Sequence, residues 1–296
     1  MKAVLVLVIT WMVLVPEIVT TAQAAPAPAS RVSVSYVPPK DPAHQPIYEQ
    51  LQKLRFLENL QEFLSPFRLP RMLLVKVEGC DGDANAWYEN NEITVCYEYV
   101  DQLWKTMPAE TTAAGVAPVD ALVGPLFDTC LHEFAHAIFD MLRVPVFGRE
   151  EDAADQVSAY IMLHLGKAEA RRLIGGVAYA YKTEVDAAAA PLGITQFADV
   201  HGTPAQRYYD VLCIAYGADA QPFGDFVEKG YLPKERAEDC QDEYRQAAHA
   251  YEQLIGPHID PGLAKEVFDK SWLPDATTRL PGRLGSPQPT PQTTTP

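Results

Sequence analysis

One motif constrains this chain more than any other feature. An H-E-x-x-H sequence occupies residues 132–136, in the middle of a helix that the apolar pattern predicts from about Pro125 to Leu142. Pro125 suits the first turn of this helix, and Pro145 stops it. Residues four apart on a helix differ in direction by only about 40°. The two imidazoles therefore leave the same face and can bind one metal ion.

The glutamate of the motif has the position that a general base requires. Glu133 lies about 100° round the helix from His132, near the metal but off its axis. A carboxylate there can take a proton from a water molecule whose pKa Zn²⁺ has lowered. Short motifs also match by chance, so two surface histidines beside an ordinary glutamate are the alternative interpretation. The position on a helix, followed by an acidic segment, favours the metal site.

A catalytic zinc site needs a third protein ligand and one open position. The candidates are the acids at 150–152, at the start of a second predicted helix over 149–165. Only Glu151 has an acid one turn later, Asp155, which can orient a ligand histidine through its distal N–H. We therefore predict one Zn²⁺ per chain, bound by His132, His136 and Glu151. Glu150 or Asp152 is the alternative third ligand, although dipole compensation explains both acids well, and Mn²⁺, Co²⁺ or Fe²⁺ suit similar ligands.

Several other polar residues are weaker candidates. The stretch before Cys213 holds four side chains that could stabilise the oxyanion of a tetrahedral intermediate or simply form structural hydrogen bonds: His201, Arg207, Tyr208 and Tyr209. Cys130 lies about 140–160° round the helix from the two histidines, so we expect a core cysteine. His164 should also miss the metal. The remaining histidines are predicted at the surface: His44, His249 and His258.

The N-terminus has the pattern of a secretory signal peptide. Lys2 precedes an apolar run over residues 3–15, and Ala22-Gln23-Ala24 forms a small-x-small cleavage site. We predict a signal peptide over 1–24, cut after Ala24, and a secreted or periplasmic protein; an uncleaved anchor is the alternative. The run is short for a membrane span, and no later segment is long and apolar enough. After cleavage we expect no membrane association.

The charge balance limits the partners. The chain has 24 Lys and Arg against 39 Asp and Glu, a net charge of −15, and loss of residues 1–24 removes one charge of each sign. Nucleic acid and anionic membrane would repel such a protein. The oligomeric state is left open by the sequence.

Five cysteines are compatible with an oxidising compartment. Cys80 and Cys96 flank a hairpin-like stretch, and Cys213 and Cys240 flank a helix–loop region, so proximity in sequence suggests the pairs Cys80–Cys96 and Cys213–Cys240. An odd count leaves Cys130 over.

Proline divides the chain into two arms and one domain. We predict a Pro-rich linker over 25–46 and a disordered Pro/Thr-rich tail over 275–296, because these arms have little to bury. The domain, 47–274, reads as helix over 48–64, strands over 72–77 and 91–99, and helices near 125–142, 149–165, 167–182, 203–216 and 234–255. This is an α+β pattern, mostly helical with a small sheet.

The motif followed by Glu151-x-x-x-Asp155 resembles the zincin fold of metallopeptidases, in its Glu-ligand branch. That resemblance places 91–99, or the strand near 72–77, at the sheet edge above the active-site helix, where an extended substrate could pair. Segments between about 72 and 245 are also similar to a bacterial family of unknown function that carries a metallopeptidase motif. These segments are residues 80–88, 93–98, 132–137, 145–156, 206–209, 213 and 216–217. The family resemblance supports both disulfide pairs.

These observations lead to one main hypothesis and two alternatives. The main hypothesis is an exported zinc-dependent peptidase in which Glu133 activates water to hydrolyse a peptide or protein substrate. An exported zinc-binding or protein-interaction module without turnover is the first alternative, and an intact Glu133 disfavours it. The second is zinc-dependent hydrolysis of a non-peptide bond, such as an amide of the cell wall, which the same site could perform.

Overall fold

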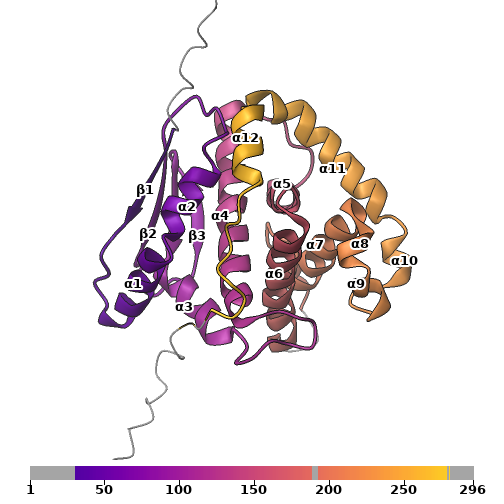
Figure 1. Ribbon diagram of the computed structural model, residues 1–296, viewed down its shortest axis with the longest axis horizontal. Coiled ribbons are helices and arrows are strands. Elements are labelled where there is room, and N and C mark those ends of the chain that lie inside the picture. Colours follow the sequence, from indigo (N-terminus) through magenta and orange to yellow (C-terminus); the bar gives the residue numbers. More distant parts are fainter. Residues whose placement is uncertain (1–30, 189–192, 279, 281–296) are drawn as a thin grey trace, which may run out of the picture.

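A long central helix separates the two sides of the molecule. The computed structural model describes residues 31–188, 193–278 and 280, so the predicted signal peptide and nearly all of the predicted tail lie outside the described residues. Helix α4 (Pro118–Leu142) runs through the middle, with a four-stranded sheet on one side and most of the helices on the other (Figure 1). The predicted α+β class, mostly helical with a small sheet, is confirmed.

The sheet is mixed. Its order is β1-β2-β4-β3, in which β1 (Val32–Tyr36), β2 (Leu73–Glu78) and β4 (Glu92–Cys96) run parallel and β3 (Ala86–Glu89) is antiparallel to β4. Both strands that the zincin resemblance placed at the sheet edge are therefore inner strands. The edge beside α4 belongs to β3, which the periodicity did not predict because it has only four residues.

The prediction of a linker over 25–46 is wrong for its described part. Residues 31–46 contain β1, a 3-10 helix η1 (Pro42–His44) and the start of α1 (Gln45–Lys53). Val32 is buried, and β1 pairs with β2 through all five of its residues. The prolines cluster after β1, where they interrupt no sheet hydrogen bond. His44, predicted at the surface, is buried beside Tyr97.

Two further predicted elements differ from the structure: one helix is divided in two, and one strand ends early. The helix over 48–64 is broken into α1 and α2 (Phe56–Phe63), because Arg55 adopts a left-handed conformation between them. The strand predicted to Tyr99 ends at Cys96, and helix α3 (Tyr97–Thr106) begins at the next residue. Tyr97 and Val100 are buried on one face of this helix, at a helical spacing. Tyr97 also continues the alternation of apolar residues along the preceding strand, so the alternation hides the start of the helix.

Helix α4 begins seven residues before Pro125. Pro118 occupies its first turn, and Pro125 lies inside it without a backbone N–H to donate. The helix is nevertheless continuous, because packing on nearly every side outweighs one missing hydrogen bond. On one side it lies against α6 (Lys167–Ala187) so closely that a Cβ on Gly176 would come within 2.1 Å of the Asp120 carbonyl oxygen.

The remaining helices form the other side of the molecule (Figure 1). Those predicted over 149–165, 167–182 and 203–216 appear as α5 (Glu150–Leu163), α6 and α7 (Pro204–Ala218). The one predicted over 234–255 is divided into α10 (Lys234–Ala237) and α11 (Cys240–Leu254). Five short elements were not predicted: η2 (Ile194–Ala198), α8 (Ala220–Phe223), α9 (Asp225–Glu228), η3 (Gly256–His258) and α12 (Pro261–Phe268).

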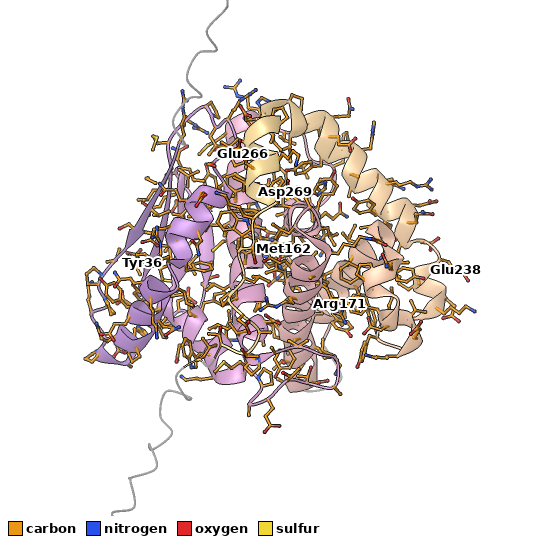
Figure 2. The ribbon with its side chains drawn as sticks, viewed as in Figure 1. Tyr36, Met162, Arg171, Glu238, Glu266 and Asp269 are labelled. Carbon is orange, nitrogen blue, oxygen red and sulfur yellow. A yellow bond between two sulfur atoms is a disulfide. The ribbon has the colours of Figure 1, made fainter. Side chains whose placement is uncertain are left out.

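Both predicted disulfides are present. Cys80 is bonded to Cys96 and Cys213 to Cys240, while Cys130 is a buried free cysteine. The second bond ties α7 to α11. Side chains such as that of Met162 fill the interior between the helices, and acids such as Glu238 and Glu266 lie outside (Figure 2). Among the described residues, no helix combines the length and apolar character that a membrane crossing needs.

Candidate metal centre

Two helices bring the predicted ligands together. Arg143, which follows the last residue of α4, has a left-handed conformation, and Gly148, with a φ of 94°, precedes α5. These two positive φ angles let the chain turn back, so that the first turn of α5 faces the middle of α4. His132 and Glu133 are 4% and 8% exposed, and both are therefore polar groups that need partners inside the protein.

The three predicted ligand atoms converge on one point. Glu151 Oε2 lies 3.0 Å from His132 Nε2 and 3.2 Å from His136 Nε2, and the two Nε2 atoms are 3.2 Å apart. Tetrahedral Zn²⁺ with bonds of about 2.0–2.1 Å separates its ligand atoms by about 3.3 Å. The spacing of this triangle, two imidazole nitrogens and a carboxylate oxygen, therefore fits a zinc ion, and it leaves a fourth position for water or substrate.

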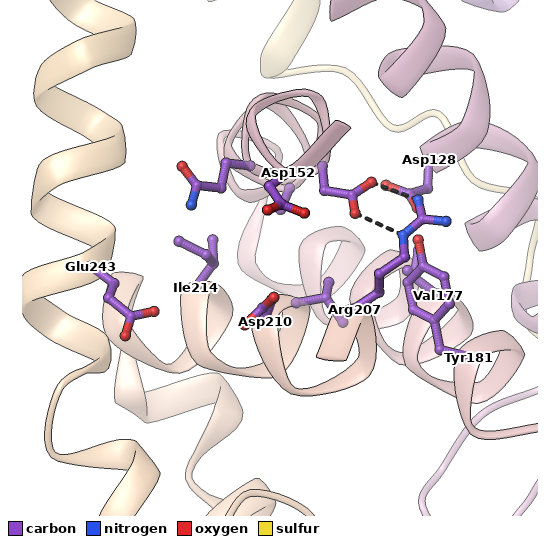
Figure 3. A pocket seen from close by; sticks show the side chains of 12 residues that line it. Asp128, Asp152, Val177, Tyr181, Arg207, Asp210, Ile214 and Glu243 are labelled. Carbon is purple, nitrogen blue, oxygen red and sulfur yellow. Dashed lines mark hydrogen bonds and ion pairs between the residues drawn. The ribbon is translucent and has the colours of Figure 1, made fainter. Parts of the chain in front are cut away.

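A buried chain of charges holds His132. Its Nδ1 lies 2.7 Å from Asp155 Oδ1, and Asp155 in turn accepts hydrogen bonds from Arg207 Nε at 2.7 Å and Nη2 at 2.6 Å. The guanidinium lies 4.7 Å from the centre of the Tyr181 ring, above that ring and beside Asp128 (Figure 3). A bidentate arginine fixes the plane of a carboxylate. Arg207 thus fixes Asp155, and Asp155 fixes the imidazole that faces the metal position.

The second histidine has a more exposed partner. His136 Nδ1 lies 2.8 Å from Glu150 Oε1, and 55% of the Glu150 side chain is exposed. The sequence reasoning explained Glu150 as compensation of the helix dipole and missed this contact. The sequence spacing of His136 and Glu150 does not predict their contact, because the contact depends on the angle at which α5 crosses α4.

The electrostatics of the site favour the charged form of each member. Burial lowers the pKa of His132, but the hydrogen bonds that its ring donates to Asp155 and Glu151 outweigh burial and raise this pKa to about 10 in the metal-free protein. The hydrogen bond with His132 lowers the pKa of Glu151 to about 2. Burial raises the pKa of Asp155, yet His132 and Arg207 together bring it well below its ordinary value. Carboxylates in this state are ready to bind a cation.

Glu133 lies at the meeting point of α4 and the sheet edge. Burial raises the pKa of its carboxyl group and outweighs the lowering effects of His132, His136 and the nearby backbone of Tyr88 in β3. The hydroxyl of Tyr88 donates to Asp140 of α4 at 2.7 Å, which anchors β3 along the helix. A buried carboxylate with a raised pKa is suited to accept and return a proton.

The weaker candidates for the oxyanion role have different positions relative to the three ligand atoms. His201 Nε2 lies 2.9 Å from Glu151 Oε2, and its Nδ1 lies 3.1 Å from Asp199, an acid that sequence reasoning did not select. Arg207 contacts Asp155, so its role as an oxyanion donor is replaced by the clamp described above. Tyr208 is buried against Tyr209, away from the ligand triangle. His164, expected to miss the metal, is bonded to the Tyr160 carbonyl.

Comparison with known proteins agrees with this geometry. The model of a protein family described as "Putative metallopeptidase" matches residues 36–255, and the chain belongs to this family. Membership implies a metal-dependent hydrolase that acts on peptide or protein substrates. No curated protein and no solved structure gives a significant match to the chain.

Proposed function

We propose that the protein is an exported zinc peptidase with a zincin-like active site. His132, His136 and Glu151 hold the ion. The observation that carries this proposal is the triangle of ligand atoms, 3.0–3.2 Å on each side, next to a buried glutamate on the same helix. Zn²⁺ bound by these three residues would supply a Lewis acid, which would polarise a carbonyl group and make water more acidic.

The residues of the chain then divide the proton transfers and charge stabilisation. Glu133 accepts a proton from the attacking water and returns it to the nitrogen of the leaving amine. His201, next to Glu151 and 43% exposed in its side chain, faces solvent at the metal position and donates a hydrogen bond to the oxyanion of the tetrahedral intermediate. Asp199 holds the other ring nitrogen of His201.

The substrate backbone pairs with β3. Trp87 is opposite Thr94, and Cys96 donates to the Asn85 carbonyl, so alternation turns the backbone groups of Ala86 and Tyr88 away from β4. Their free edge lies along α4 beside Glu133. An extended peptide can add there as a fifth strand, which presents its scissile bond to the metal position.

Export is part of the same proposal. Two disulfides in one chain are typical of an oxidising compartment. The signal pattern over 1–24 then directs the protein to the periplasm or the medium. N-terminal sequencing of the protein from its natural host tests this step, with Ala25 as the expected first residue.

Metal content is the primary test. Elemental analysis of the purified protein is expected to give about one zinc per chain, with strong loss in His136→Ala and Glu151→Ala. Glu133→Gln is expected to keep zinc and lose hydrolysis of a peptide library. Zinc binding without hydrolysis in the wild type would favour the non-catalytic zinc module. No zinc after reconstitution would exclude both functions.

A further inference from the structure

A cavity of about 220 Å³ opens next to Glu133. It extends from the metal position toward the N-terminal half of α4, and residues from α3, α4, α6, α7 and the segment before β3 line it. Whole small-molecule sites are usually larger, about 300–1,000 Å³. The volume and the position beside the general base therefore suit one side chain of a bound substrate.

The cavity wall holds a polar group that lacks a partner. Tyr181 is 9% exposed, and its hydroxyl has no hydrogen-bond partner among the described residues. Its ring lies under Arg207 (Figure 3), and this contact fixes the orientation of the phenol. A hydroxyl in a cavity wall can donate a hydrogen bond to, or accept one from, a ligand group or a water molecule. Beside it, Tyr99 and Thr129 share one hydrogen bond of 2.7 Å.

The charge of the wall is negative. Asp128 and Glu184 both line the cavity, as does the carboxylate of Glu133. Arg207 also lines it but is bound to Asp155 through two hydrogen bonds. Asp128 accepts only the Ser158 hydroxyl, at 2.6 Å, apart from backbone groups, and the Glu184 carboxylate has no hydrogen bond or ion pair among the described residues. The other basic groups of the wall are also engaged, because His132 contacts Asp155 and His201 contacts Glu151. The three carboxylates therefore face no unengaged basic group among the described residues that line the cavity.

We propose that this cavity binds a long basic side chain, arginine or lysine, of the substrate residue next to the scissile bond. Glu184 at the rim and Asp128 at the base are its anionic partners, and the Tyr181 hydroxyl accepts a further hydrogen bond. This assignment rests on the peptidase function proposed above and names its substrate class. Arginine fits best, because its five donors match two carboxylates and one phenol.

Two independent features support a cation over other side chains. Burial raises the pKa of Asp128 to about 6 and also raises that of Glu184, and Arg207, which is bound to Asp155, lowers both only in part. An acidic substrate side chain would instead meet three carboxylates. A purely apolar side chain would form no hydrogen bond with the Tyr181 hydroxyl or with the Glu184 carboxylate.

Glu184 offers the cleanest test, because it lies on an exposed part of α6 and its carboxylate forms no hydrogen bond or ion pair among the described residues. The zinc-loaded wild type, Glu184→Gln, Glu184→Lys and Tyr181→Phe would digest a peptide library, with mass spectrometry of the residues next to each cleaved bond. Asp186→Asn is the matched control, since it removes an acid two residues along the same helix and outside the cavity.

The expected result is cleavage next to arginine and lysine by the wild type and by Asp186→Asn. The preference for arginine over norleucine should fall on the order of tenfold in Glu184→Gln and reverse toward glutamate in Glu184→Lys. A smaller loss is expected for Tyr181→Phe. Cleavage next to apolar or acidic residues, or an unchanged preference in Glu184→Gln, would overturn the proposal and leave the peptidase function intact.

A binding measurement separates the two proposals if no peptide is cleaved. NMR titration would compare Nα-acetyl-arginine amide with Nα-acetyl-norleucine amide, using Glu133→Gln protein with and without Glu184→Gln. Tighter binding of the arginine amide that depends on Glu184 supports the cavity assignment even without turnover. Equal binding of the two amides refutes it.

Discussion

The two histidines of the metal centre have very different surroundings. His132 is almost fully buried, and its partner Asp155 is held in turn by Arg207. His136 lies at the edge of the site, and its partner Glu150 is more than half exposed and has no second residue to hold it among the described contacts. We call these the inner and outer sides of the site.

The difference shows where the geometry of the site is determined. An exposed carboxylate contributes little, because water and salt compete for it. A buried, bidentate ion pair is rigid, and loss of one partner leaves an uncompensated charge. The inner side should therefore set both the stability of the α4–α5–α7 contact and the affinity for metal, while the outer side tunes them only slightly.

Arg207→Met should have the largest effect. It leaves Asp155 inside the protein without its main partner, and we expect a loss of about 3 kcal/mol in the free energy of unfolding. Urea denaturation measures it, with Arg245→Met as the control because Arg245 is exposed on α11. If the additional change Asp155→Asn fails to recover part of the loss, the effect does not come from the unpaired carboxylate.

The pH dependence of the metal-free protein tests the same inner contacts. The pKa of His132 rises from 6.5 to about 10 on folding, so its contribution is present below pH 6.5 and is lost as the pH rises through about 10. The pKa of Glu151 falls from 4.5 to about 2, so its contribution is lost as the pH falls below 4.5.

These two shifts predict greatest stability between about pH 4.5 and 6.5, with a loss on the order of a few kcal/mol by pH 9. The same contact between His132 and Glu151 contributes to both shifts, so the effects are not additive. Urea denaturation with a chelator at pH 5.5 and pH 9 measures the difference. Equal stability at both values would contradict the inner-side interpretation, and added zinc should remove the alkaline loss.

Asp155→Asn should weaken zinc binding by about 10- to 100-fold, because the imidazole of His132 loses its anionic partner. Competition with a chromophoric chelator gives the dissociation constant, and circular dichroism verifies that the variant is folded. Asp152→Asn is the control on the same helix, since Asp152 pairs with Arg149 and with no other basic residue of the described part of the chain. Equal affinity in both variants would exclude the proposed role of Asp155.

Glu150→Gln should have the smallest effect. The contact with His136 is exposed, so we expect a change of less than about 1 kcal/mol in stability and only a few-fold change in zinc affinity. The effect should also shrink as salt is added. An effect as large as that of Asp155→Asn would remove the distinction between the two sides.

The sequence predicted the fold well where a single helix face carried the signal. Helices α5, α6 and α7 appear within a few residues of their predicted bounds, except that α6 continues to Ala187. The errors occurred where tertiary packing overrides local preference. Pro125 lies inside α4, Arg55 divides the first predicted helix, and β1 lies in a segment whose prolines indicated a linker.

The candidate site could be predicted only in part for a related reason. Fixed spacing on one helix placed His132, Glu133 and His136, and a one-turn spacing singled out Glu151 and Asp155. Contacts between different helices and strands leave no fixed spacing in the sequence, so they could not be predicted in this way. Arg207 was one of four candidates for the oxyanion or for structural hydrogen bonds, and it is bound to Asp155, which is 52 residues away in sequence. The cavity wall joins residues from four helices that no motif connects.

The sequence by itself determined the class of protein and predicted the ligand set. Helical periodicity is a local property, so a short motif is sufficient to define which side chains share a face. Only the tertiary structure decided that β3 forms the free edge, that Arg207 holds Asp155, and that Glu184 and Tyr181 face the same cavity as Glu133. These relations depend on the angles at which whole helices pack, and those angles result from the complete core and from no single segment.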